Sequence, residues 1–90
     1  MNKKLFMLSI IMLYSVSSYS MKYGGPVQCS GDNWYSAVVI GIGKVTVFKC
    51  KDGSIKGEIS QRFGWMEPIE GNYARSYFDA FAKKCKKQSN

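Results

Sequence analysis

The sequence predicts a small α+β domain in which a three-stranded antiparallel sheet carries one C-terminal helix packed on one face, stapled by a disulfide. Three observations support this fold class. Short β-branched and aromatic runs follow a Gly-rich segment, an Asp-Gly pair separates two of these runs, and an apolar stripe at helical spacing ends the chain. The sequence also allows a short fourth strand at residues 27–29, N-terminal to the other three.

Residues 1–20 have the layout of a secretory signal peptide. A short basic start precedes an apolar run, residues 5–14, and Ser18 and Ser20 are the small residues ahead of a cleavage site before Met21. This run is too short to cross about 30 Å of hydrocarbon, so we expect no stable membrane span after cleavage. We therefore expect an exported protein, periplasmic or secreted. An uncleaved anchor and a buried core helix are the alternatives.

The mature chain, residues 21–90, is short enough for one domain, and its core is marginal without a staple. It keeps eleven basic and six acidic side chains, a net charge of +5. Four lysines, Lys83, Lys84, Lys86 and Lys87, crowd its C-terminus. We expect these lysines to keep the domain soluble and to complement the helix end. The alternative is that they bind an anionic envelope component, because such a group attracts polyanions.

Two strands are predicted at residues 34–40 and 44–50, and a third begins after Asp52-Gly53. Asp-Gly between such runs is typical of a two-residue hairpin turn. That turn places Cys50 opposite Ile55, and with it Phe48 opposite Gly57 and Thr46 opposite Ile59. Because side chains alternate between faces, the expected core face carries Phe48, Cys50, Ile55 and Ile59.

Residues 63–71 are predicted to form a loop, since Pro68 argues against a central strand. The loop contains two large aromatic residues, Phe63 and Trp65. We expect them to fold back and cover the small core. The alternative is an exposed aromatic contact at Trp65.

A helix is predicted from Tyr73 to about Lys87, with Asn72 as its N-cap. One face of this helix is apolar and includes a cysteine. Its members are Ala74, Tyr77, Phe78, Phe81 and Cys85.

The expected staple is a disulfide between Cys50 and Cys85. Both residues point inward in this reading, one from the hairpin and the other from the helix stripe, and packed layers can bring them within bonding distance. Cys29 is then the unpaired thiol. It is also the alternative partner, because a strand at residues 27–29 can lie beside the hairpin.

The residue types argue against catalysis. Without histidine the common nucleophile–base pairs are excluded, and three cysteines without a CxxC pair form neither a redox motif nor a zinc site alone. Glu67 and Glu70 are a weak carboxylate pair. We therefore expect no enzyme, no cofactor and no metal site. We do not expect nucleic-acid binding either, since the protein is exported and Phe48 is read as inward.

The expected function is that of a small exported, non-catalytic binding or accessory protein of the bacterial envelope, recognising an anionic surface or a protein partner. Two alternatives belong to other classes. One is a toxin-like or antibacterial effector with a membrane-active basic helix, and the other is an inhibitor of an envelope enzyme.

Overall fold

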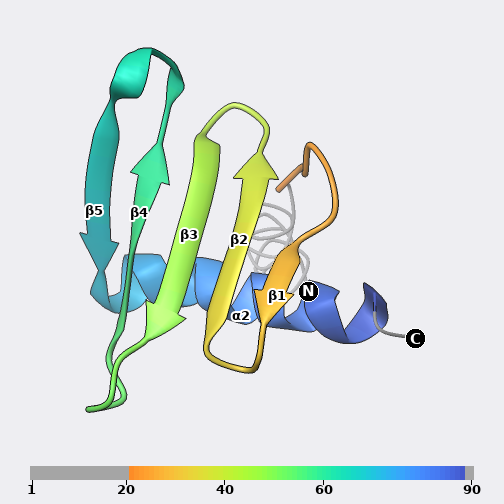
Figure 1. The fold of residues 1–90 in the computed structure, drawn as a ribbon, viewed down its shortest axis with the longest axis vertical. Helices are drawn as coiled ribbons and strands as arrows, with labels where there is room; N and C mark the ends of the chain where they lie inside the picture. The colour runs from red at the N-terminus through yellow and green to blue at the C-terminus, as the bar shows by residue number, and fades with distance from the viewer. Residues whose placement is uncertain (1–20, 89–90) are drawn as a thin grey trace, which may run out of the picture.

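The computed structural model describes residues 21–88 as an antiparallel sheet with a helix across one face (Figure 1). The predicted signal peptide, residues 1–20, lies outside the described residues. The elements are β1 (Gln28–Ser30), β2 (Trp34–Val39), β3 (Gly43–Lys49), β4 (Ile55–Ser60), a 3-10 turn η1 (Arg62–Gly64), β5 (Met66–Glu70) and α2 (Gly71–Gln88). The α+β class, the antiparallel sheet and the C-terminal helix are confirmed. Within the described residues, no helix combines the length and apolar character that a membrane crossing requires.

The sheet has five strands rather than three, in the order β1-β2-β3-β4-β5. The first strand, β1, is the short N-terminal strand that the sequence left open. The last, β5, corrects the prediction of a loop at residues 63–71, because it contains Pro68. Proline lacks the N–H that a second neighbour needs, but β5 is an edge strand that pairs only with β4. Pro68 therefore excludes a central position and permits an edge position.

The pairing of β3 with β4 differs by one residue from the prediction. Lys49 lies opposite Ile55 and Val47 lies opposite Gly57. The cause is the turn. Cys50 N–H donates to the Ser54 carbonyl over 2.8 Å, and Gly53 N–H donates to the Cys50 carbonyl over 2.9 Å. These bonds enclose a three-residue turn with Gly53 at a φ of 90°, which is a common longer alternative to the two-residue turn.

A shift of one residue exchanges the two faces of a strand, because successive side chains point to opposite sides. The core therefore receives Val45 and Val47 from β3, both fully buried. Phe48 lies on the opposite face with 39% of its surface exposed, so the prediction that it faces the core is wrong. Cys50 leaves the sheet at the turn and is half-buried. The inward positions predicted for Ile55 and Ile59 are confirmed.

The helix α2 packs its predicted stripe against the sheet. Ala74, Tyr77, Phe78 and Phe81 are buried, and the ring of Phe78 meets the ring of Tyr35 edge-on at 5.0 Å between centroids. The helix begins at Gly71, so Asn72 lies within its first turn instead of capping it. The buried residues form one core between the layers: Val27, Tyr35, Ala37, Val39, Val45, Val47, Ile55, Ile59, Ile69, Ala74, Tyr77, Phe78 and Phe81.

The disulfide joins Cys29 to Cys85, with 6.3 Å between their Cα atoms, so the prediction of a Cys50–Cys85 bond is wrong. Cys50 is the unpaired cysteine among the described residues. The alternative partner named for Cys85 is the observed one. The layers are stapled as expected, but by the first strand instead of the central hairpin.

Topology explains this pairing. The strand β5 runs directly into α2, so the helix starts beneath one edge of the sheet and crosses toward the other (Figure 1). At about 1.5 Å per residue, Cys85 lies about 21 Å along the helix from Gly71. Five strands at about 4.8 Å spacing separate the two edges by about 19 Å. The last turns of α2 therefore lie under β1, where Cys29 shares the helix-side face with its cross-strand partner Tyr35.

Candidate functional site

The two ends of the sheet carry different candidate surfaces. At one end lie the β1–β2 and β3–β4 turns, and α2 crosses the sheet nearby; we refer to it as the anchored end (lower end in Figure 1). At the other end lie the β2–β3 turn and the loop between β4 and β5. A third surface is the solvent side of α2, where the predicted lysines lie.

The four predicted lysines are exposed on the last turns of α2. Their spacing puts them on the side opposite the buried stripe. They do not form one compact cluster. Lys83, Lys84 and Lys87 line a hollow with Met21, Tyr23, Asp79 and Ala80, whereas Lys86 lines a different hollow. The Nζ atom of Lys84 lies 4.8 Å from the centre of the Tyr23 ring, a cation–π distance.

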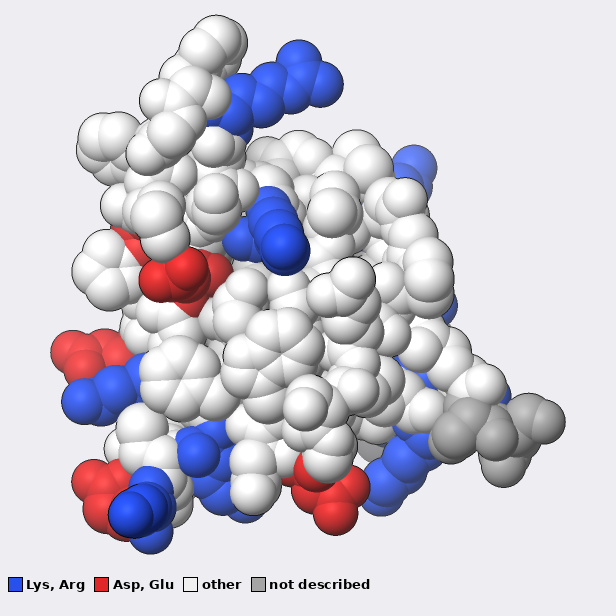
Figure 2. Space-filling model, in the orientation of Figure 1, with Lys and Arg blue, Asp and Glu red and all other residues white. Residues whose placement is uncertain are grey.

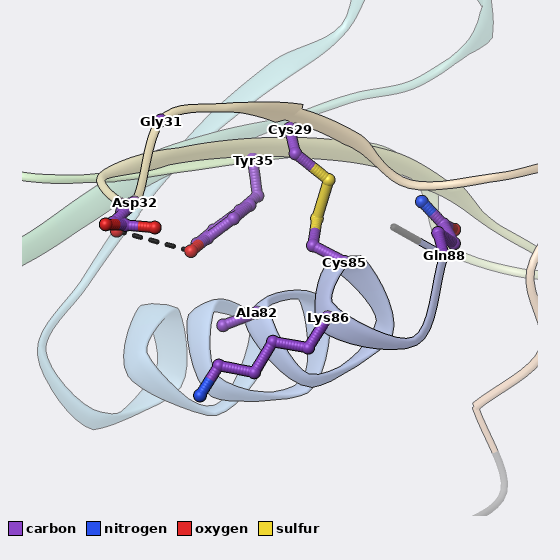
Figure 3. A pocket seen from close by; sticks show the side chains of 8 residues that line it. All are labelled: Cys29, Gly31, Asp32, Tyr35, Ala82, Cys85, Lys86 and Gln88. Atoms are coloured by element: carbon purple, nitrogen blue, oxygen red, sulfur yellow. Dashed lines mark hydrogen bonds between the residues drawn. A yellow bond between two sulfur atoms is a disulfide. The ribbon is translucent and has the colours of Figure 1, made fainter. Parts of the chain in front are cut away.

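The second hollow lies beside the disulfide (Figure 3). It has a volume of about 460 Å³. The Tyr35 hydroxyl donates a hydrogen bond of 3.2 Å to the Asp32 carbonyl across it. Burial, and to a lesser degree the charge of Asp32, raises the pKa of Tyr35, so this phenol stays protonated at neutral pH. A protonated phenol donates hydrogen bonds and does not act as a base. The lining residues are Cys29, Gly31, Asp32, Tyr35, Ala82, Cys85, Lys86 and Gln88.

Large apolar side chains are exposed at the end of the sheet opposite the anchored end. Phe63 is fully exposed at 103% of its reference surface, Trp65 at 60%, Met66 at 55% and Ile40 at 58%. We refer to these four residues as the apolar tip. Ile40 and Phe63 line one hollow, although they come from different connections. Exposed apolar groups gathered from separate segments are typical of an interaction surface.

Two hydrogen bonds of Gln61 hold the two loops of the apolar tip together. Its backbone N–H donates to the Trp65 carbonyl over 2.8 Å and closes the β4–β5 loop. Its side-chain Nε2 donates to the Ile42 carbonyl over 3.0 Å and links that loop to the β2–β3 turn. The apolar side chains are thus presented by backbone with internal hydrogen bonds.

Phe63 has a φ of 71°, the one positive φ of a non-glycine residue in the described chain. This left-handed region disfavours residues with a Cβ. The expectation that Phe63 and Trp65 cover the core is wrong, because both point into solvent. The alternative, an aromatic contact at Trp65, agrees with its exposure, and Phe63 and Ile40 are members of the surface that the sequence reading missed.

Cations surround the apolar tip. Arg62 lies in the loop, Lys44 lies at the start of β3, and the carbonyl of Lys22 accepts a hydrogen bond of 2.8 Å from Ile40 N–H. Residues 38–46 and 60–66 contain no acidic residue. Figure 2 views the sheet from the side opposite α2, and the charged groups at its upper end are blue.

Two acids flank the acid-free segment. Glu58 lies on the outer face of β4, opposite Thr46 and two residues before Ser60, whereas Glu67 acts on the other side of the sheet. Burial first, then a hydrogen bond and the charge of Tyr73, and finally the charge of Glu67 raise the pKa of Tyr77 to about 12. Tyr77 is buried on α2, so the carboxylate of Glu67 is felt on the helix side. The apolar tip therefore combines aromatic and aliphatic groups with positive charge.

Among residues 21–88, no group of three His, Cys, Asp or Glu residues is placed to hold a metal ion. No protein-family model matches the chain, and searches of curated proteins and of solved structures found no significant match.

Proposed function

We propose that this chain is an exported, non-catalytic binding module of the bacterial envelope, and that the apolar tip is its contact surface. The observation that carries the proposal is the exposure of Phe63, at 103%, beside Trp65 and Ile40 at one end of the fold. A large apolar side chain in water gains free energy when a partner covers it. The tip thus offers binding energy that folding does not use.

Export is supported by two features. Residues 1–20 have the composition of a signal peptide, and the Cys29–Cys85 disulfide is compatible with an oxidising compartment. The location is periplasmic or secreted, and the partner is an anionic surface or an envelope protein.

The two other function classes receive less support. A toxin-like role for α2 requires its apolar stripe to reach a membrane, but Ala74, Tyr77 and Phe81 of this stripe are buried against the sheet. An enzyme inhibitor requires a surface that fits one enzyme, and no residue pattern points to such a target. The lysines of α2 contribute long-range attraction to anionic material in this proposal.

The test is retention of the exported protein on bacterial envelope fractions, compared between two single variants. Phe63→Ser removes the most exposed aromatic side chain of the apolar tip, and Phe48→Ser removes one from the outer face near the anchored end. We expect Phe63→Ser to lose at least about tenfold in retention and Phe48→Ser to keep it. Equal retention of wild type and Phe63→Ser would contradict the proposal.

A further inference from the structure

We propose that the partner of the apolar tip is the interface of an anionic phospholipid bilayer. Phe63 and Trp65 enter the headgroup and upper acyl region, and Lys22, Lys44 and Arg62 contact lipid phosphates. This inference rests on the proposed function and specifies the partner of the same surface.

The shape and chemistry of the apolar tip suit a bilayer interface. Phe63 projects completely from the fold, as its exposure of 103% requires, so its partner must surround it rather than offer a flat face. A bilayer interface does this without a preformed pocket. Tryptophan is favoured at that depth, because its ring is apolar and its N–H still reaches water or headgroups.

The cations near the aromatic side chains suit an anionic lipid. Lys44 lies in the same cross-strand row of the outer face as Met66, through Ser60. Arg62 directly precedes Phe63 in the loop. Cations placed immediately behind an apolar insertion meet the phosphate layer when the insertion is buried. Of the two acids that flank this segment, Glu67 exerts its charge on Tyr77 beneath the sheet, and Glu58 lies on the outer face of β4 opposite Thr46, farther from the loop than Ser60.

The backbone of the β4–β5 loop is hydrogen-bonded in a way that suits insertion. A bilayer has few partners for unsatisfied N–H and C=O groups, so an inserting loop must satisfy them internally. Gln61 bonds both across its own loop, to Trp65, and to the neighbouring turn, at Ile42. The backbone N–H and the side-chain Nε2 of Gln61 thus donate within the fold, and the tip presents apolar side chains and charge. These suit a fluid anionic interface better than a protein surface, which also offers directional hydrogen bonds.

The conformation of Phe63 also favours a membrane anchor. Glycine adopts a φ of 71° without the cost that a Cβ brings. The chain instead holds a phenylalanine there and leaves its whole ring in water. Neither feature stabilises the fold, and both are accounted for if the ring is a membrane anchor.

The experiment is sedimentation of the purified exported protein with large vesicles. One set contains phosphatidylglycerol and phosphatidylcholine, and the other contains phosphatidylcholine alone. We expect binding to the anionic set, weakened about tenfold or more in Phe63→Ser and about fivefold in Arg62→Gln, with Phe48→Ser unchanged. In a Trp34→Phe background, the fluorescence of Trp65 is expected to shift to the blue on binding.

The outcomes separate this inference from the proposed function. Retention on envelope fractions that depends on Phe63, without binding to anionic vesicles, means a protein partner and overturns the inference alone. Vesicle binding that survives Phe63→Ser but disappears when Lys83, Lys84, Lys86 and Lys87 are replaced by Gln assigns the contact to α2 and overturns both. Equal binding to the two vesicle sets overturns the role of the cations.

Discussion

At the anchored end of the sheet, glycine holds the left-handed positions of the turns, whereas the connections at the apolar tip hold a phenylalanine at one such position beside Gly41, Gly43 and Gly64. Gly53 occupies a φ of 90° in the β3–β4 turn, and the Asp52 carboxylate accepts hydrogen bonds from the Ser54 N–H and hydroxyl. Lys49 N–H donates to the Asn33 carbonyl and ties that turn to the β1–β2 connection. At the apolar tip, the corresponding left-handed position is held by Phe63. The difference separates turns whose residues suit their backbone from a loop that holds an exposed phenylalanine in a conformation that glycine favours.

The largest expected effect tests the turn at the anchored end, because that turn decides which face of β3 is buried. Val47→Asp puts a carboxylate into the core, where the fully buried valine packs, and should cost more than about 4 kcal/mol of unfolding free energy. Phe48→Asp changes the outer face and should cost less than about 1 kcal/mol. Denaturation in urea measures both. If Phe48→Asp costs more unfolding free energy than Val47→Asp, Phe48 faces the core and the hairpin has the two-residue turn.

The hairpin between β3 and β4 could be predicted from the sequence, but its register could not. The Asp52-Gly53 pair correctly predicts a hairpin, but it fits both a two-residue and a three-residue turn. The strand alternation did not resolve the two, since Val45 and Val47 on one face are as apolar as Phe48 and Cys50 on the other. The prediction of a Cys50–Cys85 disulfide was wrong because it relied on this register, although the helix stripe with Cys85 was predicted correctly.

The candidate site was predicted less well than the fold. Trp65 was named, but the exposure of Phe63 depends on a left-handed backbone that no propensity assigns to phenylalanine. Ile40 joins the surface only because the strands alternate in direction in the order β1-β2-β3-β4-β5, which places the β2–β3 and β4–β5 connections at the same end of the sheet. The absence of acids from residues 60–66 is visible in the sequence, and it is a signal by which this segment could have been found.

The second expected effect concerns the staple beside the anchored end. Replacing Cys29 and Cys85 by Ser opens a loop with a sequence separation of 56 and should cost about 4 kcal/mol in the chain-entropy model. Urea denaturation of the double variant measures this loss. Cys50→Ser is the matched control and should leave the midpoint nearly unchanged, since its thiol is free. A comparable loss in Cys50→Ser would mean that Cys50 is in the native pairing.

The third effect has the opposite sign and lies at the apolar tip. Phe63→Gly should stabilise the fold by about 1 kcal/mol, because glycine adopts the left-handed conformation freely and the ring makes no buried contact. Phe63→Ala is the matched control, since it removes the ring but keeps a Cβ, and it should gain little. Thermal unfolding measures both variants. If Phe63→Gly is destabilising, the ring supports the fold and the contrast between the ends disappears.

The smallest effect is a pH dependence confined to the anchored end. Hydrogen bonds from the Ser54 side chain and backbone lower the pKa of Asp52 below its ordinary 3.8. A lowered folded-state pKa adds stability that is complete above the unfolded value and is lost as pH falls through the folded value. Wild type should therefore exceed Asp52→Asn slightly in unfolding free energy at neutral pH, and the gap should close below pH 3.8.

The same measurement in a Ser54→Ala background isolates the cause, because one of the two hydrogen bonds is then absent and the pH-dependent gap should shrink. The apolar tip supplies the contrast. Residues 60–66 contain no carboxylate, so the gain from Phe63→Gly should stay constant over the acid range in which the Asp52 effect is lost. A Phe63→Gly gain that changes over that range would show that a titrating group acts on the tip, and its cationic character would then have to be reassigned.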